Sequence, residues 1–229
     1  MIIDKYKSGS TGNLYKISDS RTSILMECGL SIKKIGELTN FSYMDCAGCL
    51  LTHEHSDHSK SAKDLLNLGL NVYMSLGTAE SLKLENHWNA CLMIPEKQYS
   101  IGTFIVKGFV VNHDAKEPFG YFIYSTVTKE RLLFVTDTYW IEPVFPKLNY
   151  LMIECSFDEE VLKNNEVNSY YAKRLVVSHM SIRMVLDYVK KIDISVLKGI
   201  HLLHLSDKSS KEDEFIRKIQ AVSGVPVYV

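Results

Sequence analysis

Three histidines and one aspartate lie within six consecutive positions of the sequence, at His53, His55, Asp57 and His58. Protonated imidazoles this close together would repel one another. The cluster becomes favourable when the rings are neutral and bind a metal ion together with the carboxylate. Residues two apart share one face of an extended strand, and His53 and His55 can therefore bind the same ion. Asp57 and His58 lie in the turn that follows, where they can face a second ion.

Three more ligand candidates lie further along the chain, and each follows an apolar run that is typical of a buried strand. They are His113, Asp137 and His204. Side chains at strand ends commonly form the functional sites of α/β scaffolds. One such histidine or aspartate alone would more often be an ordinary surface residue. Together, the three candidates supply the further ligand atoms that a pair of metal ions needs.

The elements that position these residues can be predicted from hydrophobic spacing and turn residues. Apolar runs predict strands over Leu14–Ser18, Ser23–Met26, Cys49–Thr52, Phe104–Val111, Tyr121–Tyr124, Leu132–Val135, Tyr150–Ile153, Gly199–Leu205 and Val225–Val229. Helical spacing predicts helices over Lys60–Leu68, Gly77–Leu84, Ser169–Val176, Ile182–Lys191 and Lys211–Val222. This order favours an α/β fold in which helices cover β-sheets, within a single domain over residues 1–229.

Composition limits the function classes. The 229 residues are 46% hydrophobic and 23% charged, as in a folded globular protein, with a net charge of −1 that excludes a basic nucleic-acid coat. Phosphate chemistry then requires another source of positive charge, which bound metal ions would provide. No apolar stretch is long enough to span a membrane. The odd number of cysteines, five, argues against a disulfide framework and favours a cytoplasmic location.

The ordered set of motifs resembles the metallo-β-lactamase superfamily, and within it most of all the YycJ/WalJ-like branch, in which nuclease activity is reported. The resemblance covers nearly the whole chain. Besides the histidine cluster, it includes the segments Ser8–Asn13, Glu27–Ser31, Ser178-His179 and Leu203–Ser206. It implies an αββα four-layer sandwich, with two mixed β-sheets flanked by helices and the metals at one sheet edge.

The resemblance also implies how the ligands are shared between two divalent ions. One ion would be held by His53, His55 and His113, and the second by Asp57, His58 and His204, with Asp137 bridging both. These histidine and carboxylate ligands suit both Zn²⁺ and Mn²⁺. Only 42 positions separate Asp137 from His179, which leaves no room for a large inserted domain.

The chain departs from the pattern of the branch at three positions near the expected site. Glu27 stands where the branch usually has Asp, and its longer side chain must still brace the metal loops. Phe157 replaces a histidine and Ile182 replaces an asparagine. The expected metal ligands are intact, but the surroundings of the substrate differ, so activity or specificity can differ from that of the relatives.

The resulting hypothesis is that the protein is a metal-dependent phosphodiester hydrolase. The favoured activity is that of a DNA or RNA nuclease acting, like an exonuclease, on single strands or ends. Two ions can activate a water molecule and clamp the attacked phosphate. Asp57 would orient the attacking hydroxide. The resemblance assigns to His179 the protonation of the leaving oxygen, with Glu154 orienting the imidazole.

Substrate contacts are expected from two segments, and two other functions remain open. The first segment, with Ser8, Ser10 and Asn13, could cradle a phosphate or form only a tight turn near the metal loops. The second, with Tyr171, Lys173 and Arg174, could stack bases and hold phosphates or be one face of an amphipathic helix. A phosphodiesterase of cyclic or other small nucleotides is one alternative, and a metal-bound regulatory or binding module is the other. The expected partner is a nucleic acid or nucleotide; a homodimer stays open, and no membrane association is expected.

Overall fold

The computed structural model describes residues 1–164, 175–205 and 211–229. The chain forms two compact units, each of which is discontinuous in sequence. Unit 1 contains Met1–Val110 and Ala115–Glu130, and unit 2 contains Val111–Asp114 and Arg131–Val229. Among the described residues no helix is long and apolar enough to cross a membrane. The single domain predicted from the sequence stays a prediction.

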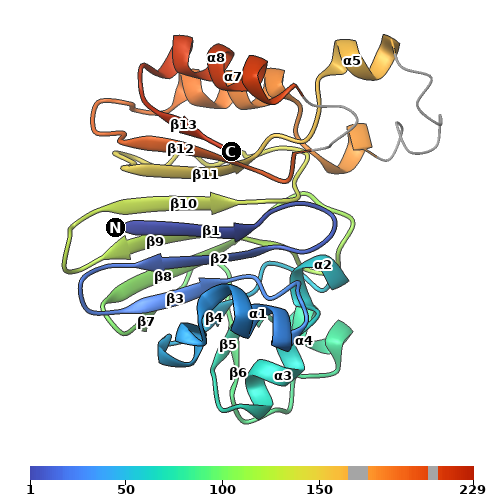
Figure 1. The fold of residues 1–229 in the computed structure, drawn as a ribbon, viewed down its shortest axis with the longest axis vertical. Coiled ribbons are helices and arrows are strands. Elements are labelled where there is room, and N and C mark those ends of the chain that lie inside the picture. The colour runs from blue at the N-terminus through green and yellow to red at the C-terminus, as the bar shows by residue number, and fades with distance from the viewer. Residues whose placement is uncertain (165–174, 206–210) are drawn as a thin grey trace. The chain divides into compact units, whose positions relative to one another are not determined.

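Unit 1 contains a sheet of six strands in sequence order, with β1 and β6 at its two edges (Figure 1). The strands are β1 (Ile2–Lys7), β2 (Leu14–Ser18), β3 (Ser23–Met26), β4 (Cys49–Leu50), β5 (Val72–Ser75) and β6 (Ala90–Met93). The pairs β1–β2 and β2–β3 are antiparallel. The pairs from β3 through β6 are parallel, so β3, β4 and β5 end at the same edge of the sheet.

Helices of unit 1 bury an apolar core against this sheet. They are α1 (Ile32–Thr39), α2 (Ser56–Ser59), α3 (Ala62–Asn67) and α4 (Leu76–Leu82), together with the 3-10 turn η1 (Ser42–Asp45). The hydroxyls of Ser31 and Ser75 accept hydrogen bonds from the first turns of α1 and α4 and so define where these helices begin. Ile35, Leu65 and Leu66 are fully buried in the core beneath them.

Three antiparallel strands complete unit 1: β7 (Gln98–Ile101), β8 (Phe104–Val110) and β9 (Phe119–Ser125). The buried side chains of Phe104 and Val106 alternate with less buried neighbours along β8, as expected for a strand with one face in the core. The loop after β8 carries His113. Phe119, at the start of β9, donates its N–H to the carbonyl of Thr52 at 2.9 Å and so fixes the beginning of the histidine segment, Thr52–His58.

A buried carboxylate, Asp19, ties together three turns of unit 1. It accepts hydrogen bonds from the backbone N–H groups of Arg21 and Thr22, and from the hydroxyls of Thr103 and Ser125 at 2.7 and 2.6 Å. Burial alone would raise its pKa, but these donors outweigh it and lower the pKa to about 2. The charged form of Asp19 therefore stabilises the fold.

The Asp19 carboxylate gives a pH-dependent prediction. Its pKa is lower in the folded than in the unfolded chain, so its contribution is present above about pH 4 and is lost as the pH falls toward 2. We expect metal-free Asp19→Asn protein to be about 2 kcal/mol less stable than wild type at pH 7, with the difference shrinking below pH 4. Urea unfolding at several pH values measures this difference. A constant difference from pH 7 to pH 2 would contradict the assignment.

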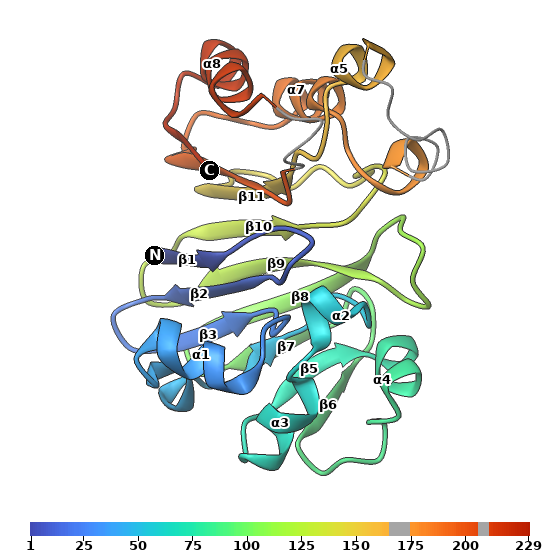
Figure 2. The ribbon, with the colours of Figure 1, turned by 45° about the vertical axis from the view of Figure 1, so that its right-hand side comes forward.

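The described residues of unit 2 form four parallel strands in the order β13-β12-β11-β10. They are β10 (Arg131–Val135), β11 (Tyr150–Glu154), β12 (Gly199–Leu203) and β13 (Val227–Tyr228). The helices in the described part of unit 2 include α5 (Glu159–Asn164), α7 (Ile182–Lys191) and α8 (Glu212–Ser223), of which α7 and α8 pack side by side (Figure 2). Strands β10 and β11 are almost entirely buried, in keeping with their continuous apolar sequences.

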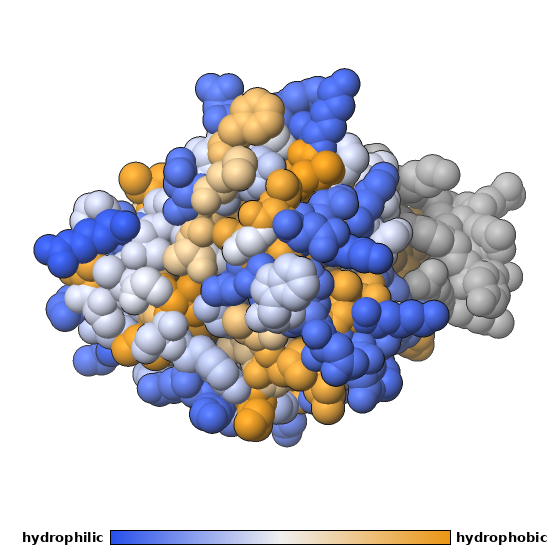
Figure 3. Space-filling view, turned by 90° about the horizontal axis from the view of Figure 1, so that it is seen from below, coloured by the Kyte–Doolittle hydropathy of each residue, from blue (hydrophilic) through white to orange (hydrophobic). Residues whose placement is uncertain are grey.

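Most predicted strands and helices are present, with shifted ends. Strands β1, β5, β6 and β7 and helices α1, α2 and α5 were not predicted, and most of the helix predicted over Ser169–Val176 lies outside the described residues. All five cysteines are free, as predicted. On the face seen in Figure 3, apolar side chains are interspersed with hydrophilic ones.

Candidate metal centre

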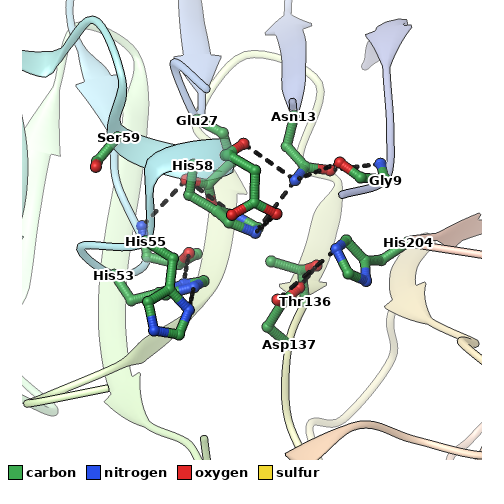
Figure 4. A network of polar contacts seen from close by, with 12 residues as sticks. Gly9, Asn13, Glu27, His53, His55, His58, Ser59, Thr136, Asp137 and His204 are labelled. Atoms are coloured by element: carbon green, nitrogen blue, oxygen red, sulfur yellow. Dashed lines mark hydrogen bonds and ion pairs between the residues drawn. The ribbon is translucent and has the colours of Figure 1, made fainter. Parts of the chain in front are cut away.

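In unit 1, the histidine segment follows β4 and leads directly into the short helix α2. Nδ1 of His53 lies 2.9 Å from the hydroxyl oxygen of Thr52, and Nε2 of the same ring lies 3.1 Å from Nδ1 of His55. The two rings meet edge to face, with centroids 4.7 Å apart. The contact with Thr52 orients the His53 ring so that Nε2 and the His55 nitrogen point toward one another (Figure 4).

His58 is fully buried between two carboxylates of unit 1. Its Nδ1 lies 3.6 Å from Oε2 of Glu27, and its Nε2 lies 3.5 Å from Oδ2 of Asp57. Nδ2 of Asn13 also lies 3.1 Å from Nε2 (Figure 4). The ring is thus held in a defined orientation, with Glu27 on its Nδ1 side.

Glu27 follows β3 and occupies the bracing position expected from the sequence, despite its longer side chain. Its Oε2 accepts a hydrogen bond from the N–H of Thr52 at 3.4 Å, besides facing His58. Complete burial raises the pKa of Glu27, whereas the neighbouring imidazole of His58 lowers it. Through its contacts with Thr52 and His58, Glu27 connects the beginning and the end of the histidine segment.

The backbone of this segment is fixed from behind by the chain that follows β1 and β3. The N–H of Asn13 donates to the carbonyl of Asp57 at 2.8 Å, and that of Cys28 to the carbonyl of His58 at 2.7 Å. Gly29 lies so close that a Cβ built on it would be 1.6 Å from the carbonyl oxygen of Asp57. Only glycine fits at this contact.

In unit 2, Asp137 follows β10 and faces two imidazoles. Its Oδ1 accepts a hydrogen bond from the hydroxyl of Thr136 at 2.8 Å. Its Oδ2 lies 3.7 Å from Nε2 of His113 and 3.8 Å from Nε2 of His204. Nδ1 of His113 lies 3.1 Å from the carbonyl oxygen of Ser178, which fixes the ring with Nε2 toward Asp137. Burial lowers the pKa of His113 and so favours the neutral ring that a metal requires.

Glu154, at the end of β11, lies between two imidazoles of unit 2. One carboxylate oxygen, Oε1, contacts Nδ1 of His179 and lies 3.7 Å from Nδ1 of His204. The other oxygen accepts the N–H of Thr138 at 2.8 Å. Burial disfavours the charged form of His179, but Glu154 outweighs this effect and raises the pKa to about 9. His179 is therefore held protonated, with its Nε2 left to donate.

Three strand ends of the site have left-handed backbone at residues other than glycine. The φ angles are 64° at Glu27, 45° at Asp137 and 52° at His204. This conformation is uncommon for such residues and costs about 1 kcal/mol or more at each position. The surrounding hydrogen bonds and packing compensate for this cost.

The donor sets of both units fit divalent ions. Ligand atoms about 2.1 Å from one ion lie about 3.0–3.5 Å from each other, and the nitrogens of His53 and His55 meet this condition at 3.1 Å. The separations of 3.7 and 3.8 Å between Oδ2 of Asp137 and the two imidazole nitrogens are too long for hydrogen bonds, as expected for donors arranged around a cation. Nitrogen and carboxylate donors of this kind bind Zn²⁺ or Mn²⁺. The fold and these clusters together indicate divalent metal binding.

The residues predicted to contact substrate differ in burial, and three of them lie outside the described residues. Ser10 is exposed and Ser8 is half-buried, where its hydroxyl accepts a hydrogen bond from Tyr15 at 2.7 Å. Asn13 is fully buried, and its amide contacts Gly9 as well as His58. Its contacts support the metal-binding segment, and direct contact with substrate stays a prediction. The other three predicted residues, Tyr171, Lys173 and Arg174, lie outside the described residues.

Sequence reasoning missed several residues that orient the site. Thr52, Thr138 and the carbonyl of Ser178 fix His53, Glu154 and His113, respectively. Asp114 has its Oδ1 only 3.1 Å from Nε2 of His113. Its position directly after a candidate ligand was the one signal that could have identified it. Two of the three positions that depart from the branch, Phe157 and Ile182, are buried apolar side chains.

Comparison with known proteins identifies the family. The sequence matches no protein-family model. It is 30% identical over 228 residues to the exodeoxyribonuclease YycJ of Bacillus anthracis, covering 90% of this chain and 83% of the relative. The chain belongs to the YycJ/WalJ-like branch of the metallo-β-lactamase superfamily. The exodeoxyribonuclease WalJ of Streptococcus pneumoniae serotype 2 (strain D39) is 25% identical over 219 residues, covering 89% of this chain and 81% of the relative.

A solved structure with the same fold is the metallo-β-lactamase fold protein YhfI from Bacillus subtilis. It aligns with a TM-score of 0.77 at 15% identity, covering 99% of this chain and 94% of that chain. The fold class predicted from the sequence, two mixed β-sheets flanked by helices, is thereby confirmed. As a member of this branch, the chain is a metal-dependent hydrolase.

Proposed function

We propose that this YycJ/WalJ-like phosphodiester hydrolase is a DNA exonuclease that acts on single strands or ends with two divalent ions, Zn²⁺ or Mn²⁺. The observation that carries the proposal is the arrangement around Asp137, where one carboxylate oxygen lies between the Nε2 atoms of His113 and His204. Two relatives over most of the chain are named exodeoxyribonucleases, which supports the choice of DNA.

The proposed ligands are the seven residues expected from the family pattern. One ion takes His53, His55 and His113, and the other takes Asp57, His58 and His204, while Asp137 serves both. Bound divalent ions supply positive charge at the phosphate and make water a better nucleophile. That charge is needed because the chain itself has a net charge of −1.

Within this proposal one P–O bond forms, another breaks and one proton passes to the leaving group. Asp57 orients the attacking hydroxide, whose oxygen bonds to phosphorus. His179 donates the proton on Nε2 to the leaving sugar oxygen, since its Nδ1 is engaged by Glu154. Ser8 and Ser10, with Tyr171, Lys173 and Arg174, are proposed to hold the strand.

The function is tested with purified protein and end-labelled substrates. Metal-stripped protein supplemented with Mn²⁺ or Zn²⁺ is expected to release nucleotides from the ends of single-stranded DNA, and chelation should stop the reaction. Double-stranded DNA, RNA and cyclic nucleotides are compared in parallel. Turnover of cyclic nucleotides without any polymer would replace the nuclease by a small-nucleotide phosphodiesterase. Metal binding without any turnover would indicate a regulatory module.

The proton donor gives a separate prediction that depends on the leaving group. We expect His179→Ala to slow DNA hydrolysis on the order of 100-fold, because the leaving alkoxide then departs without a proton. The rate of hydrolysis of a p-nitrophenyl ester of thymidine monophosphate should fall far less, since p-nitrophenolate leaves without needing a proton. The two rates are measured with the same enzyme preparation. His201→Ala, whose ring stacks on Tyr228, is the matched control and should retain both rates. Equal losses on both substrates for His179→Ala would reject the role.

A further inference from the structure

Tyr139 is an exposed aromatic residue two positions after Asp137, in the loop that follows β10 in unit 2. It is 40% exposed, whereas Asp137 and Thr138 before it are buried. Among the described residues, no aromatic ring or cation stacks on the ring of Tyr139. The next ring, that of Trp140, is covered by Nζ of Lys191, 4.5 Å from the ring centroid. Tyr139 is therefore the ring of this pair that a ligand can reach.

Hydrogen bonds hold the backbone of Tyr139 beside the segment that carries His113. The N–H of Tyr139 donates to the carbonyl of Asn112 at 2.8 Å. The hydroxyl of Thr138 accepts the N–H of Asn112 at 3.1 Å and donates to the carbonyl of Trp140 at 2.9 Å. A ring on a backbone that is already fixed loses less conformational entropy when a ligand binds to it.

The proposed proton donor, His179, lies in the same unit among the rings of proposed metal ligands. Its ring is parallel to that of His204, with centroids 5.3 Å apart, and its centroid lies 5.4 Å from that of His113. Two residues of chain span at most about 7 Å, so the Cα of Tyr139 lies within that distance of the Cα of Asp137. A nucleotide whose phosphate is hydrolysed at these residues therefore has its base within reach of the Tyr139 ring.

Stacking would also supply affinity for DNA that the charge of the chain does not. The 26 basic and 27 acidic side chains give a net charge of −1, so general attraction to a phosphate backbone is weak. Proteins that bind single strands irrespective of sequence combine phosphate contacts with aromatic side chains on which the bases stack. An exposed tyrosine beside the proposed metal centre provides such a surface.

We propose that Tyr139 is a stacking platform for a base next to the scissile phosphate, and that it makes the enzyme favour nucleotides over phosphodiesters that carry no base. The inference rests on the proposed function and adds to it the residue that contacts the base. Every base has a face that can stack on an aromatic ring, so this contact accepts all four bases. The enzyme is thus expected to hydrolyse strands of any sequence.

The test compares a thymidine oligonucleotide with an analogue that carries abasic tetrahydrofuran residues in place of the last two nucleotides at each end. The value of kcat/KM is measured on both strands, with Mn²⁺ and with Zn²⁺, for wild type, Tyr139→Ala and Tyr139→Phe. We expect Tyr139→Ala to hydrolyse the intact strand about tenfold less efficiently than wild type, and the abasic strand equally well. Tyr139→Phe keeps the ring and should behave like wild type.

A binding measurement separates the contact from catalysis. Fluorescence anisotropy of the same labelled strands in the presence of a chelator reports binding without hydrolysis, and Tyr139→Ala should weaken binding of the intact strand alone by about the same factor. Tyr228→Ala is the matched control, because Tyr228 is 49% exposed on β13 and its ring stacks on that of His201. This control should behave like wild type on both strands.

The possible failures are distinguishable. Equal losses on the intact and abasic strands for Tyr139→Ala, or no loss on either, would overturn the stacking contact. Thermal unfolding of the variants establishes that they are folded. A wild-type protein that hydrolyses neither strand would overturn the proposed function, and the anisotropy measurement would then decide the contact by itself.

Discussion

Asp137→Asn protein is expected to lose at least one divalent ion per chain and to hydrolyse DNA about a thousandfold more slowly than wild type. The substitution preserves the shape of the side chain and the hydrogen bond from Thr136. Asparagine also tolerates the left-handed backbone found at this position, where φ is 45°. The change therefore removes the negative charge shared by the two proposed ions and little else.

The magnitude follows from the role proposed for the ions. Charge stabilisation of the transition state by metals amounts to several kcal/mol, and about 4 kcal/mol corresponds to a thousandfold in rate. Elemental analysis counts the ions, and initial rates on labelled single-stranded DNA give the activity. Asp187→Asn, which removes an exposed negative charge on α7, is the matched control and should keep both its metal and its rate. Full metal content together with a normal rate in Asp137→Asn would exclude the bridging role.

Gly29→Ala is expected to destabilise the protein by at least about 3 kcal/mol and to weaken metal binding. The new Cβ would lie 1.6 Å from the carbonyl oxygen of Asp57 and 2.9 Å from the backbone nitrogen of Asn13. Both atoms belong to the backbone and are joined by a hydrogen bond of 2.8 Å. Relief of the clash must shift the segment that carries Asp57 and His58, which alters stability and ligand geometry together.

The measurement is thermal unfolding of the metal-free protein, followed by a metal titration. A loss of about 3 kcal/mol in a chain of this size lowers Tm by about 6–12 °C. Gly199→Ala is the matched control, because its Cβ would meet the ring of half-exposed Tyr228 at 3.0 Å and would lie at an ordinary contact distance of 3.7 Å from the carbonyl oxygen of Pro226. That control should change Tm far less. A Gly29→Ala protein with the Tm and metal affinity of the control would contradict the packing argument.

The parts of the fold that could be predicted from sequence are those where composition and burial agree. Strands β10 and β11 read as continuous apolar runs because both are buried, and Asp137 and Glu154 stand at their ends. Strand β1 was missed because it is an edge strand whose residues, IIDKYK, lack a clear alternation and are only partly buried. Strand β5, with the sequence VYMS, is neither a continuous apolar run nor a regular alternation of apolar and polar residues, so no strand pattern indicated it.

The candidate ligands of the site could be predicted from the sequence, whereas the groups that orient these ligands could not. His53, His55 and His58 could be found because their spacing is unusual. The roles of Thr52 and Ser178 depend on a hydroxyl and a backbone carbonyl that any loop can offer, so no sequence pattern indicates them. Glycine is required at position 29 because the backbone of Asp57 lies against it. Asp57 is 28 positions away in the chain, so residue spacing alone cannot show this contact.

The chain passes between its two compact units more than once, because Val111–Asp114 belongs to unit 2 while the residues on both sides belong to unit 1. A single cut therefore cannot separate the protein into its units. A fragment beginning at Arg131 would lack His113 and Asp114, and the complementary fragment would carry them without the rest of unit 2. Gene fusion or exchange at one junction cannot transplant either unit whole, so the two must be inherited and engineered together.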